Sequence, residues 1–264
     1  MKRVLLSAVA LVAFSAPAIA STFSVTVDGT DAIFLAGREG APIPDPSLPW
    51  GDTSSLTDDG MLRHSRPTPE EAKETVPTFV SVTGGDVVRV LDPAVGGINF
   101  FNGSSGGLFG PEGNSSLTSS TITSFGGISG YKGTQGALVG VFLSAANPTG
   151  GTAPATLDFS TIGTDFTTLS PLIGQIFFIG DGKTSGGVFH EFVAPTGATR
   201  LYFGVPDAFG FNGVPGAYDD NDGSYSIRVG VNQVPTTPAV PLPASAVLLL
   251  GALGGLRLLR KRVG

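Results

Sequence analysis

The chain has 264 residues, of which 41% are hydrophobic and 14% are charged, and it contains 39 glycines, 20 prolines and no cysteine. Without cysteine, disulfides and thiolate chemistry are excluded. Six of the 15 basic residues lie in the two terminal segments, which hold no acidic residue, so the other 9 basic and 21 acidic residues give the body a formal charge of −12. Such a surface repels phosphate backbones, and we expect no nucleic-acid partner.

Residues 1–20 have the layout of a secretory signal peptide. Two basic residues precede an apolar run from Val4 to Phe14, and Ala18 and Ala20 form a small-residue cleavage pattern. This pattern predicts a helical signal segment that is cut after Ala20, and therefore an exported protein. The alternative is a core helix that begins at Met1.

The body, residues 21–233, is predicted to be one all-β domain. Short apolar or alternating runs recur between Gly, Pro, Asn and Asp residues, which favours an antiparallel β-sandwich. The proline-rich and charged segment 38–75 is expected to form a surface loop. The predicted strands are Phe23 to Val27, Ala32 to Leu35, Phe79 to Val82, Val87 to Leu91, Ala137 to Leu143, Gln175 to Ile179, Gly187 to Val193, Arg200 to Val205 and Ser224 to Val231.

The C-terminal end consists of a proline-rich stalk, 234–243, and an apolar segment with a basic tail, 244–264. The apolar run of roughly 16 residues is short for a membrane helix, but a tilted or thinned bilayer accommodates it. The positive-inside rule then places the basic tail in the cytoplasm and the body outside. The motif residues are Val240, Pro241, Leu242, Pro243 and Ala244, and the residues that stop the membrane segment are Arg260, Lys261 and Arg262.

This order of motif, apolar helix and basic cluster resembles the VPLPA variant of the PEP-CTERM sorting signal. The resemblance implies that an exosortase-type protease in the membrane cleaves near the motif. The precursor would be anchored in the inner membrane, and the product would reach the cell surface or the exterior, where polysaccharide is a possible partner. The alternative is an ordinary C-terminal anchor without processing.

An acidic cluster, Asp219 to Asp222, precedes the last predicted strand. It is either a solvated turn or a cation site, because clustered carboxylates repel one another and a hard divalent cation relieves that repulsion. An EF-hand is excluded: with Gly223 at loop position 6, position 1 is Tyr218 and position 12 is Val229.

Two stretches, "SGGVFHEFVAPTGATRLYFGVPD" and "VPGAYDDNDGSYSIRV", resemble the PA-I galactophilic lectin family. Upstream, "GGDVVRV", "GPEGN" and "GALVGVFL" are similar to segments of that family in the same order. The resemblance implies a small β-sandwich and a calcium ion that bridges protein and galactose. The implied ligands are the side chains of Asp207, Asp220 and Asn221 and the backbone carbonyl of Ala217.

The chain departs from that family in two places. Ala208 to Gly213 is an insertion, and Gly213 stands where an alignment without a gap would put the aspartate. The sugar-contacting histidine has no counterpart, so calcium binding carries over better than galactose binding. We expect an aromatic such as Tyr218 or Phe211 to pack beside the sugar.

Two rival functions remain open beside this non-enzymatic, calcium-dependent binding of carbohydrate. One is a structural matrix or surface protein in which calcium only rigidifies the loop. The other is a hydrolase, since residues 103–107 match G-x-S-x-G around Ser105 and His190 is present. A nucleophile elbow needs a strand before it and a helix after it, whereas Ser105 lies in a glycine-rich loop, and we expect His190 to be a half-buried, hydrogen-bonded residue.

Overall fold

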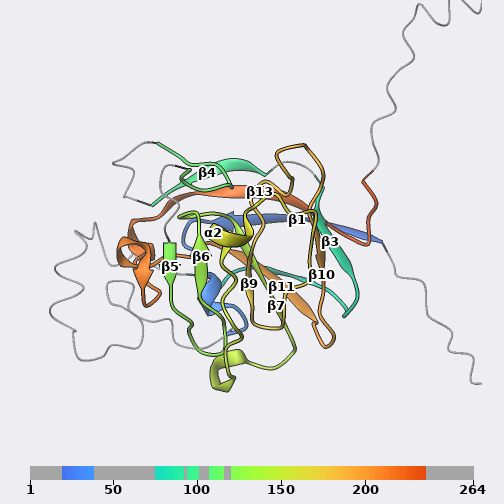
Figure 1. The fold of residues 1–264 in the computed structure, drawn as a ribbon, viewed down its shortest axis with the longest axis horizontal. Helices are drawn as coiled ribbons and strands as arrows, with labels where there is room; N and C mark the ends of the chain where they lie inside the picture. Colours follow the sequence, from blue (N-terminus) through green and yellow to red (C-terminus); the bar gives the residue numbers. More distant parts are fainter. Residues whose placement is uncertain (1–19, 39–74, 92–93, 101–106, 116–119, 236–264) are drawn as a thin grey trace, which may run out of the picture. The chain divides into compact units, whose positions relative to one another are not determined.

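The computed structural model describes residues 20–38, 75–91, 94–100, 107–115 and 120–235, and these residues form mostly β-sheet with a few short helical turns (Figure 1). The strands are β1 (Ser21–Asp28), β2 (Phe79–Ser81), β3 (Val87–Val90), β4 (Val95–Asn99), β5 (Ser120–Ile122), β6 (Tyr131–Gly133), β7 (Val139–Leu143), β8 (Thr168–Leu169), β9 (Ile176–Phe178), β10 (Glu191–Val193), β11 (Arg200–Gly204), β12 (Asn212–Gly213) and β13 (Asp222–Val231). The helical elements are α2 (Phe159–Ile162) and the 3-10 turns η1 (Ile33–Leu35), η2 (Pro148–Gly150), η3 (Phe209–Phe211) and η4 (Tyr218–Asp220).

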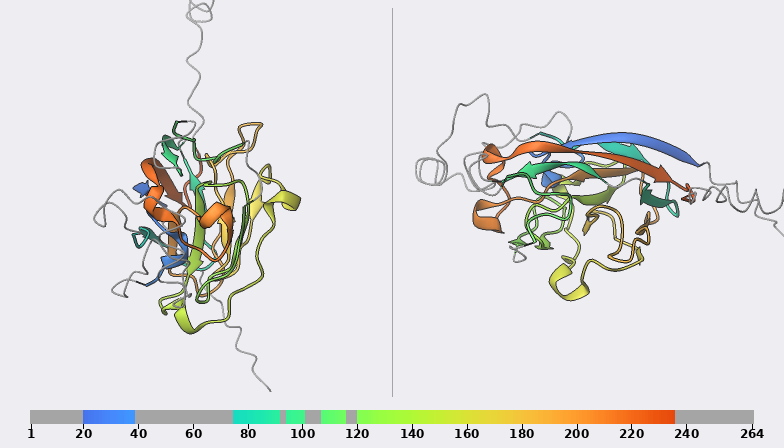
Figure 2. Two further views of the ribbon diagram at one scale, coloured as in Figure 1. Left: turned by 90° about the vertical axis from the view of Figure 1, so that its left-hand side faces the viewer. Right: turned by 90° about the horizontal axis from the view of Figure 1, so that it is seen from above.

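The largest sheet is organised around β13. Its strand order is β1-β13-β3-β10-β8, and β4 also pairs with β13. β1 lies antiparallel along β13 from Ser21↔Val231 to Asp28↔Ser224, and the two strands are seen side by side in Figures 1 and 2. On the other edge, β4 pairs with Asp222 to Ser226 and β3 pairs with Val229 to Val231. The start of β13, where the acidic cluster enters the sheet, is thus flanked by β4 on one edge and by the end of β1 on the other.

A second sheet has the order β2-β11-β7-β9, and a third, small sheet has the order β12-β5-β6. Alternate residues of β13 point into the core: Tyr225, Ile227 and Val229 are each at most 3% exposed, whereas Ser226 and Arg228 are exposed. The apolar side chains of β7, β9 and β11 join them in one hydrophobic core. This largely antiparallel arrangement is consistent with the predicted all-β sandwich.

One predicted strand was wrong. Ala32 to Leu35 makes only a single bridge, between Ala32 and Val205, and then turns into η1. The residues of η1 are all buried, so the run is apolar on every side, and such a run does not distinguish a strand from a helical turn. The sequence also missed β4, β5, β6, β8 and β12, which are short or rich in glycine.

Several predicted segments lie outside the described residues. They are the signal segment before Ala20, most of the loop 38–75, the sorting motif Val240–Ala244 and the C-terminal segment 244–264. No helix within the described part of the chain combines the length and the apolar character needed to span a bilayer. The described residues up to Gln233 belong to one compact unit.

Candidate functional site

The structure brings Asp207 and the acidic cluster together through the side chain of Tyr218. The Tyr218 hydroxyl accepts a hydrogen bond from the Asp207 amide at 3.0 Å and donates to the Val205 carbonyl oxygen at 2.8 Å. Gly216 N–H donates to the Asp207 carbonyl oxygen at 3.2 Å. The end of β11 is therefore tied to the loop that carries the other predicted ligands, even though residues 208–216 lie between Asp207 and Ala217 in the sequence.

Asn221 closes this loop and buries the acceptor atom of its side chain. Its Nδ2 donates to the Gly29 carbonyl oxygen at 2.9 Å, and its backbone N–H donates to the Tyr218 carbonyl oxygen at 3.2 Å. The side chain is thereby fixed in orientation, and the residue is only 8% exposed. Its Oδ1 is buried and has no hydrogen-bond partner among the residues that the structure describes. A buried polar atom left in this state costs about 1–3 kcal/mol unless something binds to it.

The backbone of the loop is also unusual at Ala217. Its φ of 67° and ψ of 31° lie in the left-handed region, which costs a residue with a side chain about 1–2 kcal/mol. Such conformations persist where the surrounding structure over-determines them, and they cluster at ligand clamps. Ala217 is the residue that was predicted to offer its backbone carbonyl.

The two predicted carboxylate ligands differ in their surroundings. Asp207 is 2% exposed, and its Oδ1 accepts a hydrogen bond from the next amide, Ala208 N–H, at 2.7 Å. Asp220, at the end of η4, is half-buried. Gly213, the position favoured by an alignment without a gap, instead pairs with Ile122 between β12 and β5.

The aromatic residues that we expected beside a sugar do not face solvent. Tyr218 is 0% exposed, and its hydroxyl is used for the two hydrogen bonds that join β11 to the loop. Phe211 is 6% exposed, and its ring meets Phe100 edge-on with centroids 5.9 Å apart. A different aromatic residue of this region, Phe209, is 48% exposed.

His190 lies in the core rather than at a surface site. It is 0% exposed, so it is more deeply buried than expected, and it is hydrogen-bonded as expected: its Nδ1 lies 2.5 Å from the Phe166 carbonyl oxygen. The ring stacks on Phe166 with centroids 4.5 Å apart. Burial lowers the pKa of His190, because the charged form is poorly solvated there. Ser105, its proposed partner in a hydrolase, is outside the described residues.

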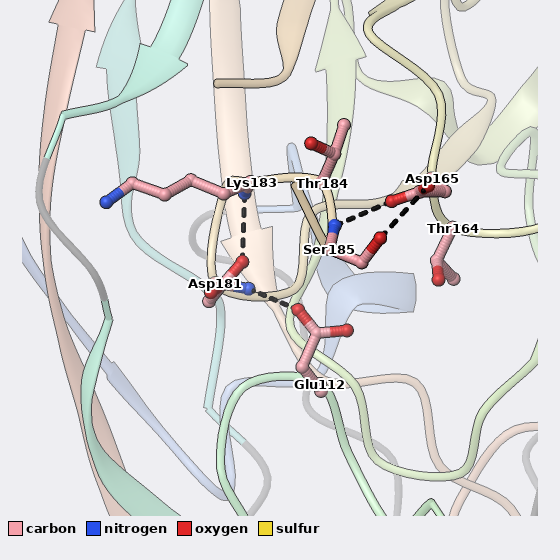
Figure 3. A pocket seen from close by; sticks show the side chains of 7 residues that line it. All are labelled: Glu112, Thr164, Asp165, Asp181, Lys183, Thr184 and Ser185. Atoms are coloured by element: carbon pink, nitrogen blue, oxygen red, sulfur yellow. Dashed lines mark hydrogen bonds between the residues drawn. The ribbon is translucent and has the colours of Figure 1, made fainter. Parts of the chain in front are cut away.

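A separate polar pocket, which the sequence did not indicate, has a volume of about 510 Å³ (Figure 3). Glu112 accepts a hydrogen bond from the Asp181 amide at 2.9 Å, and Asp165 accepts hydrogen bonds from the amide and hydroxyl of Ser185. Lys183 extends away from these acids, with its Nζ 4.7 Å from the centre of the Phe189 ring. Partial burial, together with the neighbouring Asp181 carboxyl, raises the pKa of Glu112. The three acids are far apart in the sequence and share no motif, so no local pattern indicates that they line one pocket.

Neither region holds a metal-binding group made of acids and histidines alone. In the described ranges, no three His, Asp or Glu side chains are placed to hold a metal ion together. A cation at the Asn221 loop would therefore need amide, backbone and water oxygens in addition to carboxylates, a mixture that calcium accepts.

Comparisons of the chain with protein-family models, with curated proteins and with solved structures find no match.

Proposed function

We propose that this chain is an exported, non-enzymatic, lectin-like β-sandwich of the cell surface whose loop Ala217–Asn221 binds calcium and, through it, carbohydrate. The C-terminal motif Val240–Ala244 and the basic tail support export through an exosortase-type route with the membrane segment as a transient anchor. Exopolysaccharide of the cell's own surface is the proposed partner.

The observation that carries the calcium proposal is the buried Oδ1 of Asn221, which has no hydrogen-bond partner in the described part of the chain. Calcium takes six to eight oxygen ligands from carboxylates, amide and backbone carbonyls and water. The loop supplies an amide oxygen at Asn221, a carboxylate at Asp220 and a carbonyl at the left-handed Ala217, and Tyr218 ties Asp207 to the loop. A cation there would satisfy the orphan oxygen and offset the repulsion within the acidic cluster.

The burial of His190 supports the non-enzymatic reading, because a general base must reach the substrate proton within hydrogen-bond distance. The hydrogen bond from Asn221 to Gly29, which joins the loop to the end of β1, supports the alternative of a purely structural calcium ion. The two alternatives differ in one measurable respect, namely whether carbohydrate binds when calcium is present.

The proposal is tested by calorimetric titration of calcium into the purified full-length chain and its Asn221→Ala variant. We expect saturable binding in the parent chain and at least a tenfold weaker affinity in the variant, because the variant lacks the Oδ1 ligand.

Asn232→Ala is the matched control for this titration. Asn232 directly follows β13 as Asn221 directly precedes it, but its amide is fully engaged: Oδ1 accepts from Val87 N–H and Nδ2 donates to Asp86. We expect this variant to lose stability and keep the calcium affinity. No heat and no calcium-dependent rise in Tm in the parent chain would exclude the calcium site. Calcium binding without any glycan binding would leave the structural alternative.

A further inference from the structure

β1 is an edge strand of the largest sheet. One of its edges pairs with β13 over all eight residues, and no strand of the described residues pairs with its other edge. In the right-hand view of Figure 2, β1 runs along one margin of the body. The other edge strands are short or covered: β2, β6 and β9 have three residues each, β8 and β12 have two each, and Ile98 of β4 exchanges two backbone hydrogen bonds with Phe109. Within the described part of the chain, β1 is therefore the longest open edge.

The hydrogen-bond pattern shows which backbone groups of β1 face outward. In an antiparallel ladder, every second residue directs both its N–H and its C=O group to the same neighbouring strand. Gly29 N–H donates to the Gly223 carbonyl oxygen at 2.9 Å, in register with the β1–β13 ladder, so the odd-numbered residues of β1 face β13. The even-numbered residues Thr22, Ser24 and Thr26 therefore direct their N–H and C=O groups away from the sheet.

This outward edge lacks the features by which sheet edges usually avoid pairing, namely prolines, lysines and β-bulges. β1 reads STFSVTVD and pairs with β13 without interruption. Its one charged residue, Asp28, has its backbone engaged: its N–H donates to the Asp31 carboxylate at 2.9 Å, and its carbonyl oxygen accepts from Asp31 N–H at 2.9 Å. The open edge thus ends at Asp28, and the residues before it have the backbone geometry to receive another strand.

The sequence of β1 is complementary to itself. In an antiparallel pair of two β1 strands centred on Ser24, Thr22 lies opposite Thr26 of the second copy. These outward-facing residues form hydrogen-bonded pairs, which exchange both N–H···O bonds. Between them, Phe23 lies opposite Val25 of the second copy. Threonine pairs and pairs of an aromatic with a β-branched residue both stabilise neighbouring strands, so this register combines backbone and side-chain complementarity.

We propose that the outward edge of β1 pairs with β1 of a second copy of this chain, antiparallel and centred on Ser24. The register keeps the charges apart, because Asp28 of one copy lies opposite Ala20 of the other rather than opposite its Asp28. A twofold axis through the centre makes the two edges equivalent, so the assembly closes as a dimer. The pairing uses neither calcium nor carbohydrate, and it does not depend on the proposed function.

Cysteine cross-linking of the full-length chain tests the register, because the chain has no cysteine of its own. Opposed residues of a hydrogen-bonded pair have Cα atoms about 5.5 Å apart, within the range that a disulfide spans. Ser24→Cys should therefore form a disulfide-linked dimer under mild oxidation. Thr22→Cys is the matched control, since its two copies would lie about 13 Å apart along the strands. We expect cross-linking of Ser24→Cys to be at least tenfold faster, and equal rates would overturn the inference.

Sedimentation equilibrium of the full-length chain measures the dissociation constant without a cross-link. A single strand pair is a small interface, so we expect a weak dimer with a Kd on the order of 10–100 μM. Ser24→Lys places two like charges opposite each other and should weaken the dimer at least tenfold. Ser226→Lys is the matched control, because Ser226 is exposed beside Thr26 but lies on β13, where both edges are paired. It should change the Kd by less than twofold.

Three results of the sedimentation measurement would overturn the inference. A parent chain that stays monomeric at ten times the expected Kd would leave the edge to a strand other than β1. An association that Ser24→Lys leaves unchanged would lie elsewhere in the chain. An equal loss in Ser24→Lys and Ser226→Lys would show that association depends on the charge of the surface rather than on the edge of β1.

Discussion

Asp31 is a buried carboxyl whose ionisation opposes folding. It is 7% exposed and accepts hydrogen bonds from the Asp28 amide at 2.9 Å and from the Thr75 hydroxyl at 2.7 Å. Burial outweighs these hydrogen bonds and raises the pKa of Asp31 from 3.8 to about 6. Because the pKa of Asp31 is higher in the folded than in the unfolded protein, its protonation favours the folded state. This contribution to the free energy of unfolding is complete below pH 3.8 and is lost as the pH rises through about 6.

Asp31→Asn should therefore change how stability depends on pH. Over this window the parent chain should lose about 3 kcal/mol relative to the variant, which cannot ionise. Urea unfolding of both proteins between pH 3.5 and 7 measures this difference. A constant gap between the two unfolding free energies across the range would contradict the raised pKa.

The residues of the proposed calcium loop were predictable from the sequence in part. The cluster Asp219 to Asp222 stands out in the sequence as four consecutive residues with side-chain oxygens. The resemblance to the lectin family added Asp207 and Ala217 to the predicted ligands. The unpartnered Oδ1 of Asn221 was not predictable, because the group that orients the amide is Gly29, 192 positions away in the chain. The exposure of Phe209 and the burial of Phe211 also depend on the turn between them, which short-range patterns do not describe.

The backbone of β4 lies so close to that of β13 that one position of β4 has room only for glycine. Gly96 has a φ of 97°, and a Cβ at this position would lie 2.2 Å from the Ser224 carbonyl oxygen. Gly85, in the turn before β3, has a similar φ of 93°, but a Cβ there would meet no atom of the described residues within 4 Å. The pair separates the cost of the backbone conformation from the cost of a backbone clash.

Gly85→Ala should cost about 1 kcal/mol, the strain of an alanine in the left-handed region. Gly96→Ala should cost at least about 2 kcal/mol more, because the new methyl group forces β4 away from β13. Chemical denaturation measures both values, and faster hydrogen exchange of the Ile98 amide in Gly96→Ala would locate the damage in β4. Similar losses in the two variants would show that the clash is relieved without cost.

The success of the strand predictions followed the clarity of the pattern in each element. From Ser224 onward β13 alternates apolar and polar residues, as a strand with one buried face does, and Tyr225, Ile227 and Val229 lie in the core. β4 reads VGGIN, and its two glycines hide a strand because glycine is usually a sign of a turn. Its pairing with β13 depends on the tertiary structure, since the glycines allow the close approach that the sheet requires.

At the scale of the whole body, the first and last strands are neighbours. Ser21 pairs with Val231, so the two ends of the domain meet at one end of the β1–β13 pair. The proposed calcium loop enters the opposite end of β13, at Asp222, about 30 Å away at 3.3 Å per residue. A change made at the two ends of the domain therefore lies a full strand length away from the loop.

Joining the ends of the body covalently should stabilise it without affecting the proposed calcium loop. We consider a backbone-cyclised form of residues 21–233 whose ends are joined by about five Gly and Ser residues. The link lowers the conformational entropy of the unfolded chain, and it should not strain the folded state, because the two ends already lie together there. We expect a gain of up to about 4 kcal/mol and an unchanged calcium affinity, measured by urea unfolding and calorimetry against the linear body carrying the same added residues. A cyclised body less stable than its linear control would contradict the β1–β13 register, because only ends held apart in the folded state would be strained by the link.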